Sequence, residues 1–165
     1  MRASSRLIWA AVGLTSLASV GLAFLAQYRL DMQPCPWCIL QRLIFIVIGI
    51  LSLIAAGLPG GGRGWSLRLG QLLAVLVGAF ALAGMAAALY QNLVASKSAS
   101  CDMTLADRVI SGLGLDALWP AAFEVRASCA DAATSLLGVP FELWSLTLFV
   151  LVGSLALNRL LASRR

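Results

Sequence analysis

Four long apolar stretches dominate the 165-residue chain and indicate its fold class. A helix needs about 20 mostly apolar residues to cross the hydrocarbon core of a bilayer. The stretches of this kind are residues 7–26, 39–58, 69–90 and 141–157. Because the bilayer core lacks water, each span must satisfy its own backbone hydrogen bonds, and helix is the expected conformation. We therefore predict an all-α integral membrane protein, a single domain over residues 1–165 that forms a bundle of four transmembrane helices.

The composition excludes several other classes of protein. Hydrophobic residues make up 61% of the chain and charged residues 12%, whereas soluble domains have roughly 45–50% and about 25%. A soluble domain of this size cannot hide so much apolar surface, so a soluble enzyme and a nucleic-acid-binding protein are excluded. The chain has no histidine, which removes histidine-based acid–base catalysis and most zinc and copper sites.

The first apolar stretch also has features of a cleaved signal peptide, with Arg2 and Arg6 as its charged beginning. However, the stretch is longer than the apolar region of a typical signal peptide, and no clear A-x-A cleavage site follows it. We therefore expect this segment to remain as the first membrane span.

The distribution of charge predicts the orientation of the spans, because lysine and arginine favour the cytoplasmic side. One side of the membrane has seven basic residues and no acid: Arg2, Arg6, Arg63, Arg68, Arg159, Arg164 and Arg165. The other side has the remaining five basic residues and all seven acids. We predict that both termini are cytoplasmic and that two loops, approximately residues 27–38 and 91–140, face outward.

All four cysteines fall in the two outward loops, at Cys35, Cys38, Cys101 and Cys129. Disulfides persist in oxidising compartments, so two structural disulfides are one interpretation. A bond between Cys35 and Cys38 would close only a very small loop and would restrain the unfolded chain little. C-x-x-C pairs are often redox-active. The pattern therefore favours a redox pair over a structural staple.

The residues around the C-x-x-C pair predict its local structure. Pro36 suits the first position of a helix, which places Cys35 at the N-cap and Cys38 in the first turn. The unpaired N–H groups and dipole at this helix end favour a thiolate. Arg42 lies one turn further, on the face of Cys38 and about 6 Å deeper. We expect Arg42 to stabilise the Cys38 thiolate or to hold a carbonyl oxygen of a ligand; the alternative is an anchor that reaches the interface.

Several motifs resemble the DsbB family, the disulfide bond formation proteins B of bacterial inner membranes. The segment 34–42, PCPWCILQR, carries the main resemblance. The pair Cys101-Asp102 opens the long outer loop, and residues 129–131 (CAD) precede residues 137–140 (LGVP) and Trp144. With four spans and two outward loops, the resemblance extends over essentially the whole chain.

The resemblance implies an enzyme, a protein-disulfide:quinone oxidoreductase that reoxidises a periplasmic DsbA-like dithiol oxidase. Its cofactor would be a membrane quinone, either ubiquinone or menaquinone. By resemblance, Cys101 reacts with the partner protein and Cys129 is its mate in the loop. The Cys35–Cys38 pair then reoxidises the loop pair through a transient Cys35–Cys129 bond, and Cys38 faces the quinone with Arg42 beside it.

The long outer loop contains an apolar series among polar residues: Leu113, Leu115, Leu118, Trp119 and Phe123. This series predicts a short amphipathic segment. It either lies on the membrane surface, where it limits the movement of Cys129, or packs directly against the bundle.

Glycines and tryptophans in or near the spans also suggest packing roles. Close helix packing in lipid favours small residues, and the glycines concerned are Gly13, Gly21, Gly49, Gly78 and Gly84. Tryptophan is typical of membrane interfaces, and the residues expected there are Trp9, Trp65 and Trp144.

Three other interpretations compete with a thiol–quinone oxidoreductase. The four cysteines are enough for a tetrahedral zinc site in a metal-binding membrane protein or transporter, although the chain has no second C-x-x-C. A redox-inert bundle with stapled loops is the second. A protein similar to vitamin K epoxide reductase is the third, but its active C-x-x-C lies late in the chain. We expect neither a metal nor a nucleic acid as a partner.

Overall fold

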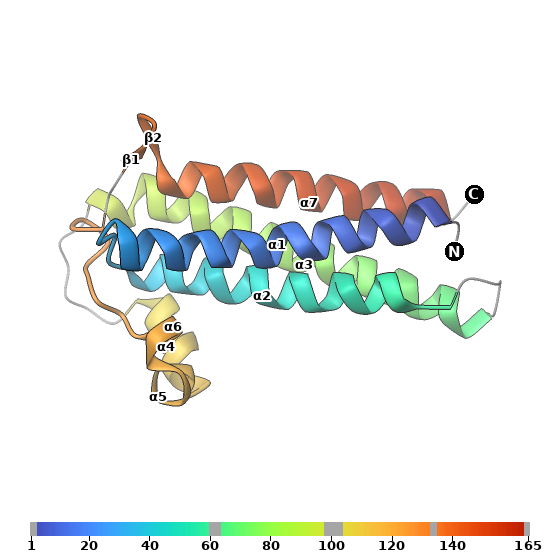
Figure 1. The fold of residues 1–165 in the computed structure, drawn as a ribbon, viewed down its shortest axis with the longest axis horizontal. Helices are drawn as coiled ribbons and strands as arrows, with labels where there is room; N and C mark the ends of the chain where they lie inside the picture. The colour runs from blue at the N-terminus through green and yellow to red at the C-terminus, as the bar shows by residue number, and fades with distance from the viewer. Residues whose placement is uncertain (1–2, 60–63, 98–103, 133–134, 164–165) are drawn as a thin grey trace.

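Four long helices form the body of the protein (Figure 1). The structure is a computed structural model that describes residues 3–59, 64–97, 104–132 and 135–163. The long helices are α1 (Ala3–Arg29), α2 (Pro36–Gly57), α3 (Gly64–Leu93) and α7 (Phe141–Ser163). Each is long and apolar enough to span a membrane. The predicted all-α membrane bundle is confirmed.

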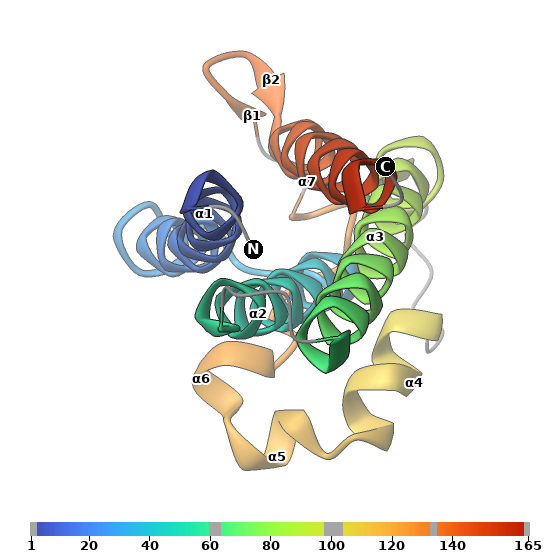
Figure 2. The ribbon, with the colours of Figure 1, turned by 90° about the vertical axis from the view of Figure 1, so that its right-hand side faces the viewer.

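The bundle is open along one side. Helix α2 packs against α1 and α3, and α7 packs against α3. In the described part of the chain, no extensive packing joins α1 to α7, and the end-on view shows these two helices apart (Figure 2). A site between α1 and α7 therefore has α2 as its third wall. It is open to the surroundings where α1 and α7 stay apart.

Close helix packing depends on three of the five glycines. A Cβ at Gly13 would lie 2.7 Å from Leu53 Cγ, and one at Gly84 would overlap the Phe149 ring. Gly49 faces the side chain of Leu17 in the same way, at 2.8 Å. The other two glycines have no such neighbour: a Cβ at Gly78 makes an ordinary 3.9 Å contact, and one at Gly21 meets nothing within 4 Å. The packing role expected of Gly21 was wrong.

The expected interfacial position of Trp9 was also wrong. Its side chain is 2% exposed and belongs to the main hydrophobic cluster of the bundle. Trp65 and Trp144 are about half exposed, which agrees with an interfacial position. Composition at a helix end does not show whether a large side chain turns inward, because that depends on the neighbouring helix.

The outer loop folds into short helices beside α2: α4 (Leu105–Gly112), α5 (Leu115–Leu118) and α6 (Pro120–Phe123) (Figures 1 and 2). Thr104 and Asp107 form a capping box at the start of α4. A short 3₁₀ helix, η1 (Ala95–Lys97), follows α3.

The apolar residues of the outer loop do not all share one environment: some pack against the bundle and others are exposed. Phe123 is buried with Ile39 of α2 and Ile110 of α4, so part of the series packs against the bundle. Leu118 and Trp119 are 84% and 52% exposed. Contact of this exposed face with the membrane surface stays a prediction.

A small hairpin connects the outer loop to α7. It consists of β1 (Ser135–Leu136) and β2 (Val139–Pro140), which pair antiparallel. The turn uses two residues with positive φ, Leu137 at 55° and Gly138 at 78°. Because β2 ends at Pro140 and α7 begins at Phe141, the hairpin lies directly at the N-terminus of α7.

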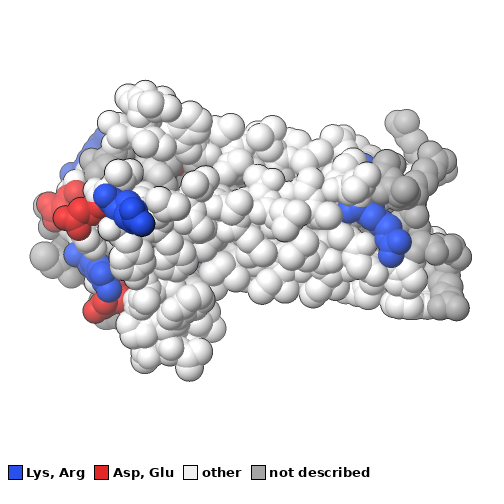
Figure 3. All heavy atoms as spheres, viewed as in Figure 1, with Lys and Arg blue, Asp and Glu red and all other residues white. Residues whose placement is uncertain are grey.

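Exposed charged side chains lie at the two ends of the molecule on the face shown in Figure 3. On the face in Figure 3, acidic and basic groups lie together at the end near the hairpin, the opposite end shows only basic groups, and an uncharged band separates them. This arrangement suits a protein whose middle contacts lipid.

We predict that Gly84→Ala destabilises the bundle, because the added methyl group overlaps the Phe149 ring, which is fully buried and stacks on Phe45 at 4.0 Å between centroids. Overpacking of this kind costs about 1–3 kcal/mol. Thermal unfolding in detergent should show a lower Tm. Gly21→Ala is the matched control and should leave the Tm unchanged or slightly raised. Equal Tm values for the two variants would contradict the packing role of Gly84.

Candidate active site

The C-x-x-C pair lies at the N-terminus of α2, as its local sequence predicts. Cys35 is the N-cap residue, Pro36 is in the first turn, and the Cys38 N–H donates to Cys35 Sγ at 3.4 Å. The Cys35 thiol donates to Cys38 Sγ at 3.2 Å. Both residues are free cysteines here, and Cys35 is completely buried. Two thiols at this distance need only a small movement to form a disulfide.

Cys129 of the outer loop lies against the same helix end. Its sulfur accepts hydrogen bonds from the Cys35 thiol and from the backbone N–H of Trp37. Cys129 is 8% exposed and shares one hydrophobic cluster with Cys35. The expectation that these two cysteines come together agrees with this contact, although they are far apart in the sequence. Cys101 lies outside the described residues.

The two sulfurs that meet here have opposite acid–base properties. The hydrogen bonds that the Cys35 thiol gives to Cys129 and Cys38, together with burial, raise the pKa of Cys35 well above its usual value. The same bond from Cys35, with that from Trp37, lowers the pKa of Cys129 against the opposing effect of burial. The thiolate is the attacking form. When Cys35 is in a disulfide it has no hydrogen to donate, and the backbone N–H of Trp37 is then the group that stabilises the Cys129 thiolate beside the Cys35 sulfur.

Two glutamines connect Cys38 to α3. The Gln91 side-chain amide donates to Cys38 Sγ at 3.1 Å, and the Gln41 amide donates to Gln91 Oε1 at 2.7 Å. Both glutamines are buried. The sequence interpretation missed Gln91 because it started the outer loop at residue 91, whereas α3 continues to Leu93. A polar amide at the end of an apolar span was the available signal, and a buried amide in a membrane protein needs a partner.

Arg42 is buried rather than extended to water, since it is 5% exposed. Its Nη1 donates to the Ala122 carbonyl at 2.8 Å, its Nη2 donates to Gln27 Oε1 at 3.1 Å, and the guanidinium lies 4.5 Å from the centroid of the Phe24 ring. Its Nε is buried without a partner among the described residues. The interpretation of Arg42 as a surface anchor does not fit this arrangement. Arg42 instead holds α6 against the bundle and brings positive charge inside it.

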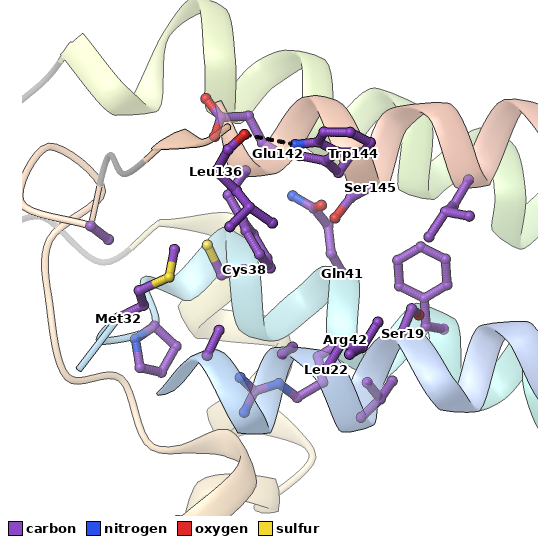
Figure 4. Close-up of a pocket in the computed structure, with 18 of the residues that line it drawn as sticks. Ser19, Leu22, Met32, Cys38, Gln41, Arg42, Leu136, Glu142, Trp144 and Ser145 are labelled. Atoms are coloured by element: carbon purple, nitrogen blue, oxygen red, sulfur yellow. Dashed lines mark hydrogen bonds between the residues drawn. The ribbon is translucent and has the colours of Figure 1, made fainter. Parts of the chain in front are cut away.

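A cavity of about 530 Å³ lies between α1, α2 and α7. Figure 4 shows Cys38, Gln41 and Arg42 on its α2 side and Trp144 on α7. The lining is mainly apolar, and the Trp144 indole donates to the Leu136 carbonyl of the hairpin at 3.4 Å. A cavity of this size, apolar with a few polar groups, is typical of a small-molecule site. It suits an apolar molecule that can accept hydrogen bonds from the few polar groups of the lining.

Comparison with known proteins gives the family. The profile of the family described as "Disulfide bond formation protein DsbB" matches residues 5–158. The chain belongs to the DsbB family. The resemblance carried by the cysteine motifs is confirmed.

The alignments with curated relatives cover most of this chain and most of each relative. The chain is 35% identical to Disulfide bond formation protein B 1 of Pseudomonas syringae pv. syringae (strain B728a), over 93% of the chain and 88% of the relative. It is also 35% identical to Disulfide bond formation protein B of Cupriavidus metallidurans, over 96% of the chain and 94% of the relative. The protein is thus a multi-pass membrane oxidoreductase of disulfide bond formation.

We predict that the thiols of this DsbB protein ionise at different pH values. In the fully reduced chain, alkylation of Cys129 should have its midpoint below about pH 8.5, the ordinary cysteine pKa, and alkylation of Cys35 above it. The reason is the hydrogen bond from the Cys35 thiol to the Cys129 sulfur. Site-resolved mass spectrometry after a short pulse of iodoacetamide measures both midpoints.

Removal of the donor tests the cause of this difference. Cys35→Ala should move the Cys129 midpoint to higher pH, whereas Cys35→Ser, which keeps a hydroxyl donor, should move it less. A Cys129 midpoint that is the same in all three proteins would show that the hydrogen bond does not control its ionisation.

Proposed function

We propose that this DsbB protein reoxidises a DsbA-like periplasmic dithiol oxidase and passes the electrons to membrane quinone. The observation that carries this proposal is the position of three sulfurs. Cys129 of the outer loop contacts Cys35, Cys35 contacts Cys38, and Cys38 borders the apolar cavity. Thiol–disulfide exchange requires direct attack of a thiolate on a sulfur, so such contacts form a route for electrons.

The proposed reaction has two stages of thiol–disulfide exchange. A thiolate of the partner attacks Cys101 of a Cys101–Cys129 disulfide, and a mixed disulfide between the partner and Cys101 forms as Cys129 leaves. The second thiolate of the partner then attacks the partner sulfur of this bond, so that the partner leaves as a disulfide and Cys101 and Cys129 are both reduced. The Cys129 thiolate then attacks Cys35 of the Cys35–Cys38 disulfide, and the S–S bond within the C-x-x-C pair breaks as a Cys35–Cys129 bond forms. Attack by Cys101 on Cys129 restores the loop disulfide and leaves Cys35 and Cys38 with the two electrons.

The geometry of Cys38 suits the end of this sequence. The amide of Gln91 donates to its sulfur, and the N-terminus of α2 stabilises negative charge there. The cavity next to Cys38 fits a quinone, because its wall is mostly apolar and the buried Nε of Arg42 still lacks a partner among the described residues. When bound, a quinone supplies a two-electron, two-proton acceptor. Arg42 and Gln41 would hold it in this cavity, and the apolar walls would exclude water.

The open side of the bundle gives a lipid-dissolved molecule direct access to the cavity. Both α1 and α7 contribute to the lining, and no extensive packing closes the space between them in the described residues. The distribution of charge favours an orientation in which both termini are cytoplasmic and the cysteines are periplasmic. In this orientation the outer loop meets a soluble partner while Cys38 faces the membrane.

The oxidation of a reduced DsbA-like protein by membranes that contain this chain tests the proposed function. We expect oxidation to require quinone, to stop after quinone extraction and to resume when quinone is added back. Cys101→Ser should abolish oxidation of the partner, while Cys35 and Cys38 in that variant are still oxidised by quinone. Oxidation that continues unchanged without quinone would overturn the proposed electron acceptor. Stoichiometric zinc bound by the four thiols would favour the metal-binding alternative.

We predict a specific kinetic effect for Arg42→Met. A hydrogen bond to a charged group contributes about 1.5–3 kcal/mol, so its loss should raise the apparent KM for quinone by about 10-fold or more. Exchange with the partner protein, measured as formation of the mixed disulfide, should change less than the quinone KM, because Arg42 acts on this loop only through its bond to the Ala122 carbonyl. Arg108→Met, at an exposed position of α4, is the control and should change neither quantity. An unchanged quinone KM in Arg42→Met would leave Arg42 with a packing role only.

A further inference from the structure

The buried carboxylic acid Glu142 has no role in the reaction as described above. It lies in the first turn of α7 and is 5% exposed. Its Oε1 accepts a hydrogen bond from the Asn92 side chain at 2.9 Å. Ionisable residues at membrane depth are costly to bury and usually have a function. A tether between α3 and α7 needs only a neutral amide, so the carboxyl group itself requires an explanation.

Glu142 and Cys38 border the same cavity. Both line it, Cys38 from α2 and Glu142 from the first turn of α7 (Figure 4). Consecutive residues of α3 connect them, because Gln91 donates to Cys38 and Asn92 donates to Glu142. The carboxyl group is also close enough to interact electrostatically with the Cys38 sulfur.

Two negative charges cannot both persist at low cost in such a site. Like charges in a poorly solvated environment raise the energy of the doubly ionised state, and one proton is then shared between the two groups. Among the described residues of the lining, Arg42 is the only other formally charged one, and it is already bonded to Gln27 and Ala122. From α3 the neighbour of Glu142 is the neutral Asn92. Cys35 and Cys129 lie beyond Cys38.

We propose that Glu142 is the proton acceptor for Cys38 and holds the proton until the electrons leave the C-x-x-C pair. In this step the S–H bond of Cys38 breaks and an O–H bond forms on the Glu142 carboxylate, with no change in oxidation state. Formation of the Cys35–Cys38 disulfide then releases two electrons and two protons, one proton from Glu142 and one from the Cys35 thiol. A bound quinone would take up both electrons and both protons. This inference rests on the proposed function for the identity of the acceptor.

Infrared difference spectroscopy tests this inference without partner or quinone. The purified chain in lipid nanodiscs is reduced with a phosphine and oxidised with a soluble disulfide. The reduced-minus-oxidised spectrum should contain the C=O stretch of a protonated carboxylic acid. Glu142→Gln should lack this band, and Asn92→Ala, which breaks the tether but keeps the carboxyl group, should retain it. Identical difference spectra for the unaltered chain and Glu142→Gln would overturn the proposal.

The kinetics of quinone reduction give a second measurement. General acid–base groups contribute about 100-fold or more to rate, so Glu142→Gln should lower kcat by about 100-fold and leave the quinone KM nearly unchanged. Glu142→Asp should restore part of kcat. Glu124→Gln alters an exposed acid of the outer loop paired with Arg126 and should change neither kcat nor KM.

The outcomes separate this inference from the proposed function. If the unaltered chain reduces quinone, and Glu142→Gln does so equally fast, only the role of Glu142 is wrong. If the infrared band behaves as expected but the unaltered chain never reduces quinone, the coupling between Glu142 and Cys38 stands and the proposed acceptor is wrong.

Discussion

The contact of one buried thiol with two other sulfurs is the interaction on which the site depends. Cys35 donates to both Cys129 and Cys38, and electrons move between sulfurs only where the atoms touch. The N-terminus of α2 makes this contact possible, because its free N–H groups bind sulfur at Cys35 and Cys129. The N-terminus of α2 thus brings Cys35 of the first outer loop and Cys129 of the second into contact.

Hydrogen bonds between buried polar groups fix the position of the outer loop relative to the bundle near these sulfurs. Arg42 of α2 bonds to the Ala122 carbonyl of α6 and to Gln27 of α1. Gln41 and Gln91 connect α2 to α3. Each unsatisfied polar group is expensive in a membrane, so these bonds favour one arrangement of the helices over others. The same arrangement leaves Cys38 beside the apolar cavity.

The packing of the helices explains why the bundle is open between α1 and α7. Glycines at positions 13 and 49 let α1 and α2 approach closely, and Gly84 lets Phe149 of α7 pack on α3. Packing is therefore tight along α1–α2 and α3–α7, while α1 and α7 stay apart in the described part of the chain. A large apolar ligand can enter through such an opening, whereas a close-packed helix interface leaves no room for it.

The features that arise from local physical constraints could be predicted from the order of the amino acids. A span needs a continuous apolar stretch that satisfies its own backbone, so four spans were predictable, and Pro36 after Cys35 indicated a helix that begins at the C-x-x-C pair. Tertiary structure alone decided the contact between Cys129 and Cys35, the bond from Gln91 to Cys38, the position of Glu142 beside Cys38 and the inward turn of Trp9. These features join segments that are distant in the chain. Hydrophobic periodicity shows that a residue belongs to a helix, but the shape of the neighbouring helix decides what that residue touches.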